Sequence, residues 1–198
     1  MSDKSHIIAV ASQQFTKYGI ASVSMDTVAE RAGISKTTLY GFFESKEALV
    51  ETVLKTLIQL WKQQINEIVE ASDNPVQKVY KMYSNAIKEL KMLDIVFIHD
   101  LRKYYGTYFK SYEAIKHYFV FDVVQSLLNE AKAKDMLLPN VCAQHLCEMY
   151  FLQFDVLIHP IYTKENYSHR DILYALIYPV LNGILKPEYR DAIDVVDV

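Results

Sequence analysis

The segment that follows Ser24 is the part of this sequence that most restricts the fold. Two stretches of about two helical turns each, residues 25–32 and 36–42, lie on either side of a glycine turn at 33–35, and Ser24 and Ser35 stand at their N-cap positions. The glycine can take the positive φ that such a turn demands. Two short helices joined in this way match the helix-turn-helix, whose second helix lies in the major groove of DNA.

The side chains of these two helices separate into an apolar set and a polar set. The apolar set can form a small core with the helices before and after it: Phe15, Val28, Ala29, Ala32, Ile34, Leu39, Phe43, Leu49 and Val53. The polar set faces outward at the start of the second helix: Lys36, Thr37, Thr38 and Tyr40. Because the first residues of a recognition helix reach the base edges, this polar set is the predicted reading edge.

The remainder of the chain shows apolar residues at helical spacing. The 198 residues include only five Gly and five Pro, and the pattern between them contains no strand-length alternation. We therefore predict an all-α fold of about nine helices, with approximate ranges 2–18, 25–32, 36–42, 46–71, 75–90, 94–104, 107–134, 141–159 and 168–185. The long fourth helix would link an N-terminal three-helix domain, 1–47 (the head), to a larger helical domain, 48–198.

Composition favours a globular protein of the cytoplasm. Hydrophobic residues make up 51% of the chain, which is enough for a core, and the net charge of −3 argues against general coating of nucleic acid. Residues 1–47 carry five basic and five acidic side chains, so the negative excess lies elsewhere and a polyanion would prefer the head. The sequence has no run of about 18 apolar residues and no signal-peptide pattern, so we expect a cytoplasmic protein without a membrane partner.

The histidines and cysteines do not follow the spacing of catalytic or metal sites. Cys142 and Cys147 are five residues apart, a poor spacing for a redox or metal pair, and we expect reduced thiols. His145 and Glu148 lie one helical turn apart without a second pair of that kind, so no metal site is predicted. The sequence also lacks a glycine-rich phosphate loop and a nucleophile elbow, so we expect no cofactor and no enzyme activity.

The N-terminal part of the chain resembles the TetR-type transcriptional repressors. The resemblance rests on IIAVASQQFTKYG and SMDTVAERAGISKTTLYGFFESKEALV, which hold a Phe shortly before a Gly, an Ala-Gly-apolar-Ser turn, a Leu-Tyr pair and a Phe-x-x-Lys-x-x-Leu pattern. It implies a homodimer on a near-palindromic double-stranded DNA operator. It also implies that the larger domain binds a small-molecule effector and pairs the two subunits.

The resemblance implies DNA contacts at individual positions of the head and its border. Lys36, Thr37 and Thr38 match the positions that contact bases. The positions that match phosphate contacts are Ser24, Met25, Tyr40 and Lys46. Phe42 is a departure, because many members have a histidine there that meets the DNA backbone, and phenylalanine cannot donate that hydrogen bond.

Thirteen of the fifteen tyrosines fall at or after Tyr80. One interpretation is an aromatic core whose tyrosine hydroxyls reach solvent at its boundary, because tyrosine packs its ring and hydrogen-bonds its hydroxyl. The other, suggested by the resemblance, is a cavity for a flat hydrophobic or amphiphilic effector. Its lining would be Tyr83, Phe97, Tyr104, Tyr108, Tyr118, Met149 and Phe154.

The last two predicted helices carry more apolar residues than one core face needs. An isologous dimer interface would use them, since a two-fold operator needs a two-fold protein, and simple burial within one subunit is the alternative. The family pairs the corresponding helices into a four-helix bundle. The residues expected at this interface are Tyr150, Leu157, Leu173, Leu176, Ile177, Val180, Leu181 and Ile184.

Together these features predict a homodimeric DNA-binding regulator. The resemblance implies a repressor that a small hydrophobic or amphiphilic ligand releases from its operator, by shifting the helix near Gly106 and through it the spacing of the two heads. One alternative is an all-helical small-molecule binding protein or enzyme with a non-functional DNA-binding head. A helical module that binds only other proteins is a second.

Overall fold

The computed structural model describes residues 3–157 and 167–193, and helices account for nearly all of their regular structure. The α-helices are α1 (Asp3–Tyr18), α2 (Met25–Ala32), α3 (Lys36–Phe42), α4 (Lys46–Glu70), α5 (Pro75–Lys91), α6 (Ile95–Tyr104), α7 (Gly106–His117), α8 (Gln125–Ala133), α9 (Ala143–Leu157), α11 (His169–Ile172) and α12 (Tyr178–Ile184). The others are the π-helical segments η1 (Tyr118–Val124) and η2 (Leu173–Ile177) and the 3-10 helix η3 (Pro187–Ala192). The all-α prediction is confirmed, and the end of the predicted helix 141–159 lies outside the described residues.

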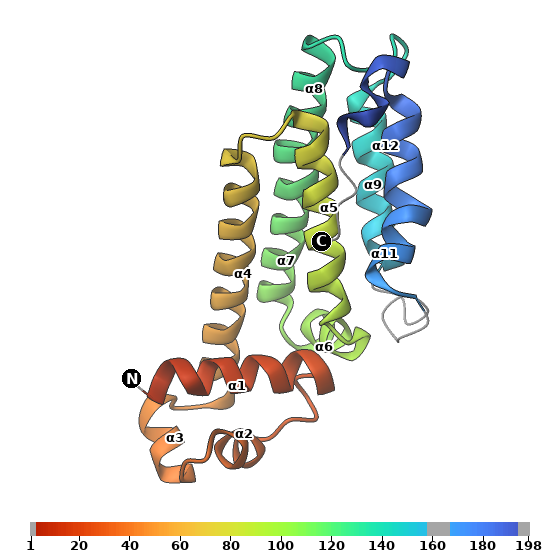
Figure 1. Cartoon of the computed structure of the whole chain (residues 1–198). Helices are drawn as coiled ribbons and strands as arrows, with labels where there is room; N and C mark the ends of the chain where they lie inside the picture. The colour runs from red at the N-terminus through yellow and green to blue at the C-terminus, as the bar shows by residue number, and fades with distance from the viewer. Residues whose placement is uncertain (1–2, 158–166, 194–198) are drawn as a thin grey trace. The chain divides into compact units, whose positions relative to one another are not determined.

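The chain divides into two compact units. Unit 1 comprises residues 1–62 and 92–113, and unit 2 comprises residues 63–91 and 114–198. A segment from the middle of the chain, which contains α6, therefore belongs with the N-terminal helices. Figure 1 labels the helices of both units along the chain.

In unit 1 a small apolar core holds the first helices together. Helix α1 contacts α2 and α6, and α2 contacts α3. The residues predicted for this core are buried, apart from the half-buried Ile34. Leu39 of α3 is fully buried, so that helix presents its remaining faces outward.

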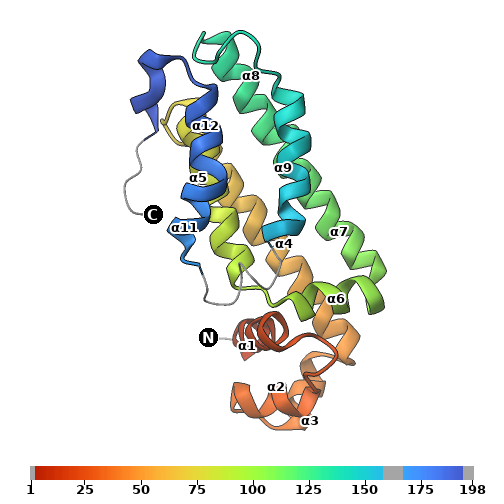
Figure 2. The same ribbon diagram turned by 90° about the vertical axis from the view of Figure 1, so that its right-hand side faces the viewer.

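In unit 2 the helices α5, α8, α9 and α12 run side by side, as Figures 1 and 2 both show. Their shared core is aromatic around Tyr83 of α5 and Tyr150 of α9, and only 1% of each of these residues is exposed. At one end the backbone N–H of Leu138 donates to the carbonyl of Ile184 over 2.9 Å. This bond joins the segment after α8 to the end of α12.

Two of the predicted long helices contain a π-helical segment that the apolar pattern did not reveal. Pro179 supplies a physical reason for η2, because proline has no N–H and its ring collides with the carbonyl four residues earlier. The N–H of Tyr178 instead donates to Leu173, five residues back. The structure shows no comparable cause for η1.

Candidate nucleic-acid interface

Side-chain caps define the two short helices of the head. The N–H of Thr27 donates to Ser24 Oγ over 3.1 Å, and the N–H of Thr38 donates to Ser35 Oγ over 3.0 Å. Between the helices, Gly33 has φ 68° and donates its N–H to the carbonyl of Glu30. The predicted caps and the left-handed glycine are therefore confirmed, and they set where α3 begins.

Polar side chains are exposed at the beginning of α3. Lys36, Thr37 and Thr38 lie in its first turn, and all three are exposed, as is Tyr40. The hydroxyl of Thr38 lies 2.8 Å from Ser35 Oγ, so one of these two oxygens donates to the other. The outward direction of the predicted reading edge is confirmed, while its contact with DNA stays a prediction.

Lys36 is paired with an acidic residue of α2. Its Nζ lies 2.7 Å from Asp26 Oδ1, and both side chains are exposed. The hydrogen bond from Lys36 to Asp26 raises the pKa of Lys36 above its ordinary value, so the ammonium keeps its charge. The sequence signal for this pair is an Asp in the first turn of α2 and a Lys in the first turn of α3, on helices that a tight turn brings together.

Lys46, at the start of α4, reaches back to the turn before α2. Its Nζ donates to the carbonyl of Ala21 over 3.4 Å. Burial lowers the pKa of Lys46, while the neighbouring carboxylates of Glu47 and Asp100 act in the opposite direction. The predicted phosphate clamp is thus half-buried and engaged with the head's own backbone.

At the beginning of α2, the groups available to a phosphate are backbone N–H groups more than side chains. Ser24 is exposed, but Met25 is buried, with 6% of its surface accessible. A phosphate at this helix end would therefore meet the N–H groups of the first turn and not the thioether. Phe42 is exposed at the far end of α3, where its ring has no donor to offer.

The residues predicted to line an effector cavity divide between the two units. Tyr83 and Phe154 belong to unit 2, and their ring centroids are 6.4 Å apart. Three others, Phe97, Tyr104 and Tyr108, belong to unit 1, where Tyr104 is 55% exposed. Tyr118 is half-buried in unit 2 and Met149 is exposed.

The aromatic group that the structure does assemble in unit 2 comprises Tyr83, Phe119, Tyr150 and Phe154. Tyr83 lies 5.4 Å from Phe119 and 4.7 Å from Tyr150, measured between ring centroids. The hydroxyls of Tyr83 and Tyr150 are buried and make no hydrogen bond with the described residues. The predicted cavity lining did not include Phe119, and Tyr150 was predicted at the dimer interface instead. Their positions in the sequence, near predicted lining residues, could have indicated both.

Most residues expected at the dimer interface lie in the subunit interior. Five are buried: Tyr150, Leu157, Leu173, Ile177 and Leu181. Three are half-buried: Leu176, Val180 and Ile184. The exposed apolar residues of α9 are others, namely Met149, Leu152 and Val156, and Tyr174 is exposed on η2. Helical periodicity identified the apolar helices but could not say which side packs inward.

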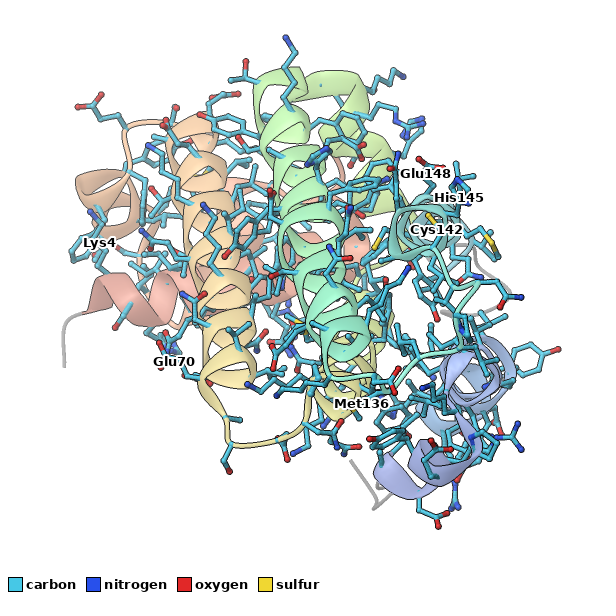
Figure 3. All side chains as sticks on the ribbon, turned by 90° about the horizontal axis from the view of Figure 1, so that it is seen from above. Lys4, Glu70, Met136, Cys142, His145 and Glu148 are labelled. Atoms are coloured by element: carbon cyan, nitrogen blue, oxygen red, sulfur yellow. The ribbon has the colours of Figure 1, made fainter. Side chains whose placement is uncertain are left out.

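No group of three or more His, Cys, Asp or Glu in the described ranges is placed to hold a metal ion. Figure 3 labels Cys142, His145 and Glu148, which lie in and just before α9. All three are exposed. Of the helices in the described part of the chain, none has the length and apolar character needed to cross a membrane.

The comparisons with known proteins agree with this geometry. The family profile described as "Bacterial regulatory proteins, tetR family" matches residues 7–53, which contain α2, the turn and α3. A Bacillus subtilis relative, the uncharacterized HTH-type transcriptional regulator YvaF, is 29% identical over 174 residues, covering 86% of this chain and 90% of its own.

Two solved structures share the fold over nearly the whole chain. The ketosteroid transcriptional regulator KstR2 of Mycobacterium tuberculosis aligns with a TM-score of 0.71 at 16% identity, covering 93% of this chain and 96% of its own. FadR from Bacillus subtilis, crystallised with stearoyl-CoA, aligns with a TM-score of 0.68 at 18% identity, covering 91% and 99%.

Profile, relatives and fold define one class of protein, the helix-turn-helix transcriptional regulators. Within that class the segment 7–53 of this chain belongs to the TetR family, and the chain is a DNA-binding transcriptional regulator.

Proposed function

We propose that this regulator is a homodimeric repressor that binds a near-palindromic operator through α3 and leaves it when a small hydrophobic or amphiphilic molecule binds. The head at 1–47 reads DNA, and residues 48–198 bind the effector and pair the subunits. The observation that supports the reading role best is the exposed first turn of α3, with Lys36, Thr37 and Thr38 opposite the buried Leu39.

The chemistry of this turn suits base edges in the major groove. A lysine ammonium can donate to O6 or N7 of guanine, and a threonine offers a hydroxyl together with a methyl that can contact thymine. Tyr40, Lys46 and the N–H groups at the start of α2 would bind phosphates and set the register. So few contacts per subunit favour two subunits on two half-sites, with recognition helices roughly 34 Å apart or somewhat more.

Selection of bound fragments from random duplex DNA tests the reading role. We expect a near-palindromic sequence to be enriched, and Lys36→Ala to weaken binding to it more than to random duplex. Enrichment without any symmetry, or no retention of DNA at low salt, would overturn the proposal and favour a small-molecule or protein-binding module.

A second copy of the chain is the occupant we propose for the exposed apolar face of α9. Met149, Leu152 and Val156 recur at helical spacing on one side of that helix, and their exposed fractions are 53%, 69% and 44%. Apolar side chains grouped on one face mark an interaction surface. A two-fold operator calls for an isologous contact, in which the same face meets itself.

Leu152→Glu places a charge in the middle of this face and should produce monomers in sedimentation or light scattering. Leu60→Glu is the matched control, because Leu60 is an exposed leucine of α4 with 49% of its surface accessible. Equal effects of the two variants, or no monomer from Leu152→Glu, would contradict the α9 interface.

The aromatic group of unit 2 is the proposed effector site. Burial raises the pKa of Tyr83 well above its ordinary value, so its hydroxyl stays protonated and can donate a hydrogen bond. Buried polar groups in proteins are nearly always hydrogen-bonded, so the Tyr83 and Tyr150 hydroxyls are candidates to meet a polar group of a mostly apolar ligand. The molecules named in the descriptions of the two structural relatives, a ketosteroid and stearoyl-CoA, both have an apolar body with polar groups.

Thermal unfolding in the presence of stearoyl-CoA or of a ketosteroid tests this site with defined probes. A molecule that binds only the folded state raises the unfolding midpoint. Tyr83→Phe keeps the ring and removes the hydroxyl, so it should reduce that rise, whereas Tyr174→Phe on an exposed ring should not. No rise with either probe would count against both ligand classes.

Coupling between effector and DNA would run through α6 and α4. Trp61 of α4 packs edge-on against Tyr112 of α7, with ring centroids 6.5 Å apart, so its fluorescence should report movement there. A ligand can shift the equilibrium between the DNA-binding and the released conformation only by as much as it binds one of them more tightly than the other. An unchanged Trp61 signal with a ligand that releases DNA would speak against this route.

A further inference from the structure

A buried carboxylate of α6 holds the turn between α1 and α2. Asp100 is only 4% exposed, and its Oδ2 accepts a hydrogen bond of 2.7 Å from the N–H of Ala21. The two residues are 79 positions apart in the sequence, yet both belong to unit 1. Because an ionised carboxylate is costly to bury without partners, this bond marks a specific role for Asp100.

Glycine at position 19 is required for this contact. Gly19 has φ 84°, a left-handed conformation that other residues seldom adopt. A Cβ built on it would lie 2.6 Å from Val96 Cγ1 and 2.9 Å from Asp100 Oδ2, so a larger residue would push α6 away. The turn and α6 thus fit closely only because residue 19 has no side chain.

Two further backbone contacts fix the same turn. The N–H of Asp94, the N-cap residue of α6, donates to the carbonyl of Thr16 in α1 over 2.8 Å. The carbonyl of Ala21 accepts from Lys46. Figures 1 and 2 show α6 beside the end of α1 in unit 1.

The held turn leads directly into the end of α2 that is proposed to contact DNA. Only two residues separate Ala21 from Ser24, the N-cap whose helix offers its first N–H groups to phosphate. We propose that Asp100 is a positioning residue for DNA recognition: by binding the N–H of Ala21 it sets the first turn of α2 against the DNA backbone. Residues 92–113 are then part of the DNA-binding module, although they lie far outside the segment 7–53 that the family profile matches.

This inference rests on the proposed operator binding, concerns the protein without effector, and stands apart from the ligand proposal. The test measures binding of the full-length protein to its selected operator by fluorescence anisotropy over a series of salt concentrations. Asp100→Ala removes the acceptor, and we expect affinity to fall roughly tenfold or more. The salt slope should fall by about 1 for each phosphate that α2 no longer binds.

Asp100→Asn separates positioning from charge, because an amide oxygen can still accept from Ala21. It should restore most of the affinity that Asp100→Ala loses. Asp122→Ala is the matched control: it removes an exposed carboxylate in unit 2, and it should leave the salt slope unchanged. If Asp122→Ala lowers affinity as much as Asp100→Ala does, the loss is not specific to the contact with Ala21 and the proposal fails.

Gly19→Ala disturbs the same contact from the side of the turn, and it should lower the affinity for DNA as Asp100→Ala does. Adding Val96→Ala removes the atom at 2.6 Å and should recover part of it, since the positive φ remains unfavourable for alanine. No recovery in the double variant, or unchanged affinity in Gly19→Ala, would contradict the close fit.

Hydrogen exchange gives a readout that a general loss of stability would not produce. At temperatures well below unfolding, the amides of residues 19–24 should exchange faster in Asp100→Ala, while those of unit 2 stay unchanged. Should Asp100→Ala fail to fold, Gly19→Ala carries the test, because its Cβ would push Asp100 away from Ala21: faster exchange at Ala21 with unchanged exchange in unit 2 supports the proposal. Exchange as slow as in the wild type would overturn it.

Discussion

Lys36 is held by Asp26 across the turn of the head, with 2.7 Å between ammonium and carboxylate. In this arrangement a neighbouring carboxylate directs the ammonium, and we expect it to restrict the approach of Lys36 to a base edge. The same carboxylate repels phosphates. We therefore expect Asp26 to have two opposed effects on DNA binding, one on sequence preference and one on overall affinity.

Asp26→Asn should separate these two effects. Without the carboxylate we expect tighter binding to random duplex and a loss of roughly three- to tenfold in the ratio of operator to random affinity, in the range of one base contact. Glu30→Gln is the control, because Glu30 is an exposed acid of α2 outside this pair. The idea is wrong if both variants change the ratio equally, as measured by competition anisotropy.

Lys46 combines a structural contact with a predicted phosphate contact. We expect Lys46→Ala to weaken binding to all sequences alike and to lower the salt slope by about 1. The matched variant is Lys17→Ala, which removes an exposed lysine of α1. A changed sequence preference with the slope intact would mean that Lys46 does not act on phosphate.

At the scale of the element, the capping serine decides how firmly α3 begins. Ser35 Oγ accepts from the N–H of Thr38 and lies 2.8 Å from its hydroxyl, so the cap and a predicted base-contacting residue share one small network. A helix of seven residues has few internal hydrogen bonds of its own, so it depends on this cap and on the buried Leu39.

Ser35→Ala should cost about 1 kcal/mol of unfolding free energy and reduce operator discrimination, because the first turn of α3 loosens. Ser168→Ala removes the comparable cap of α11 in unit 2. It should cost a similar amount in thermal unfolding and leave discrimination unchanged. Equal discrimination in the two variants would mean that the first turn of α3 does not read the operator.

At the scale of the whole molecule, the proposed dimer makes the distance between two heads a fixed quantity. Inserting about five base pairs between the half-sites of the selected operator turns one half-site to the opposite side of the duplex. We expect binding to fall to the level of a single half-site in gel-shift titrations. Full affinity for the lengthened operator would contradict a dimer that reads both half-sites at once.

The head could be predicted closely because its information is local. Ser24, Gly33 and Ser35 act through the backbone within a few residues, and the exposed set from Lys36 to Tyr40 follows from helical period. Which side of each longer helix packs inward could not be predicted in this way. Leu157 and Leu152 both suit an apolar face, yet one is buried and the other is 69% exposed.

The sequence by itself determined most of the helices and the caps of α2 and α3, because hydrogen bonds between near neighbours and hydrophobic periodicity specify them. Its resemblance to a known family indicated the class of protein. Only the tertiary structure decided that Asp100 meets Ala21, that Lys36 pairs with Asp26, and that Tyr83 packs on Tyr150. These contacts join residues on different elements, and their partners follow from how whole helices pack, which no local pattern encodes.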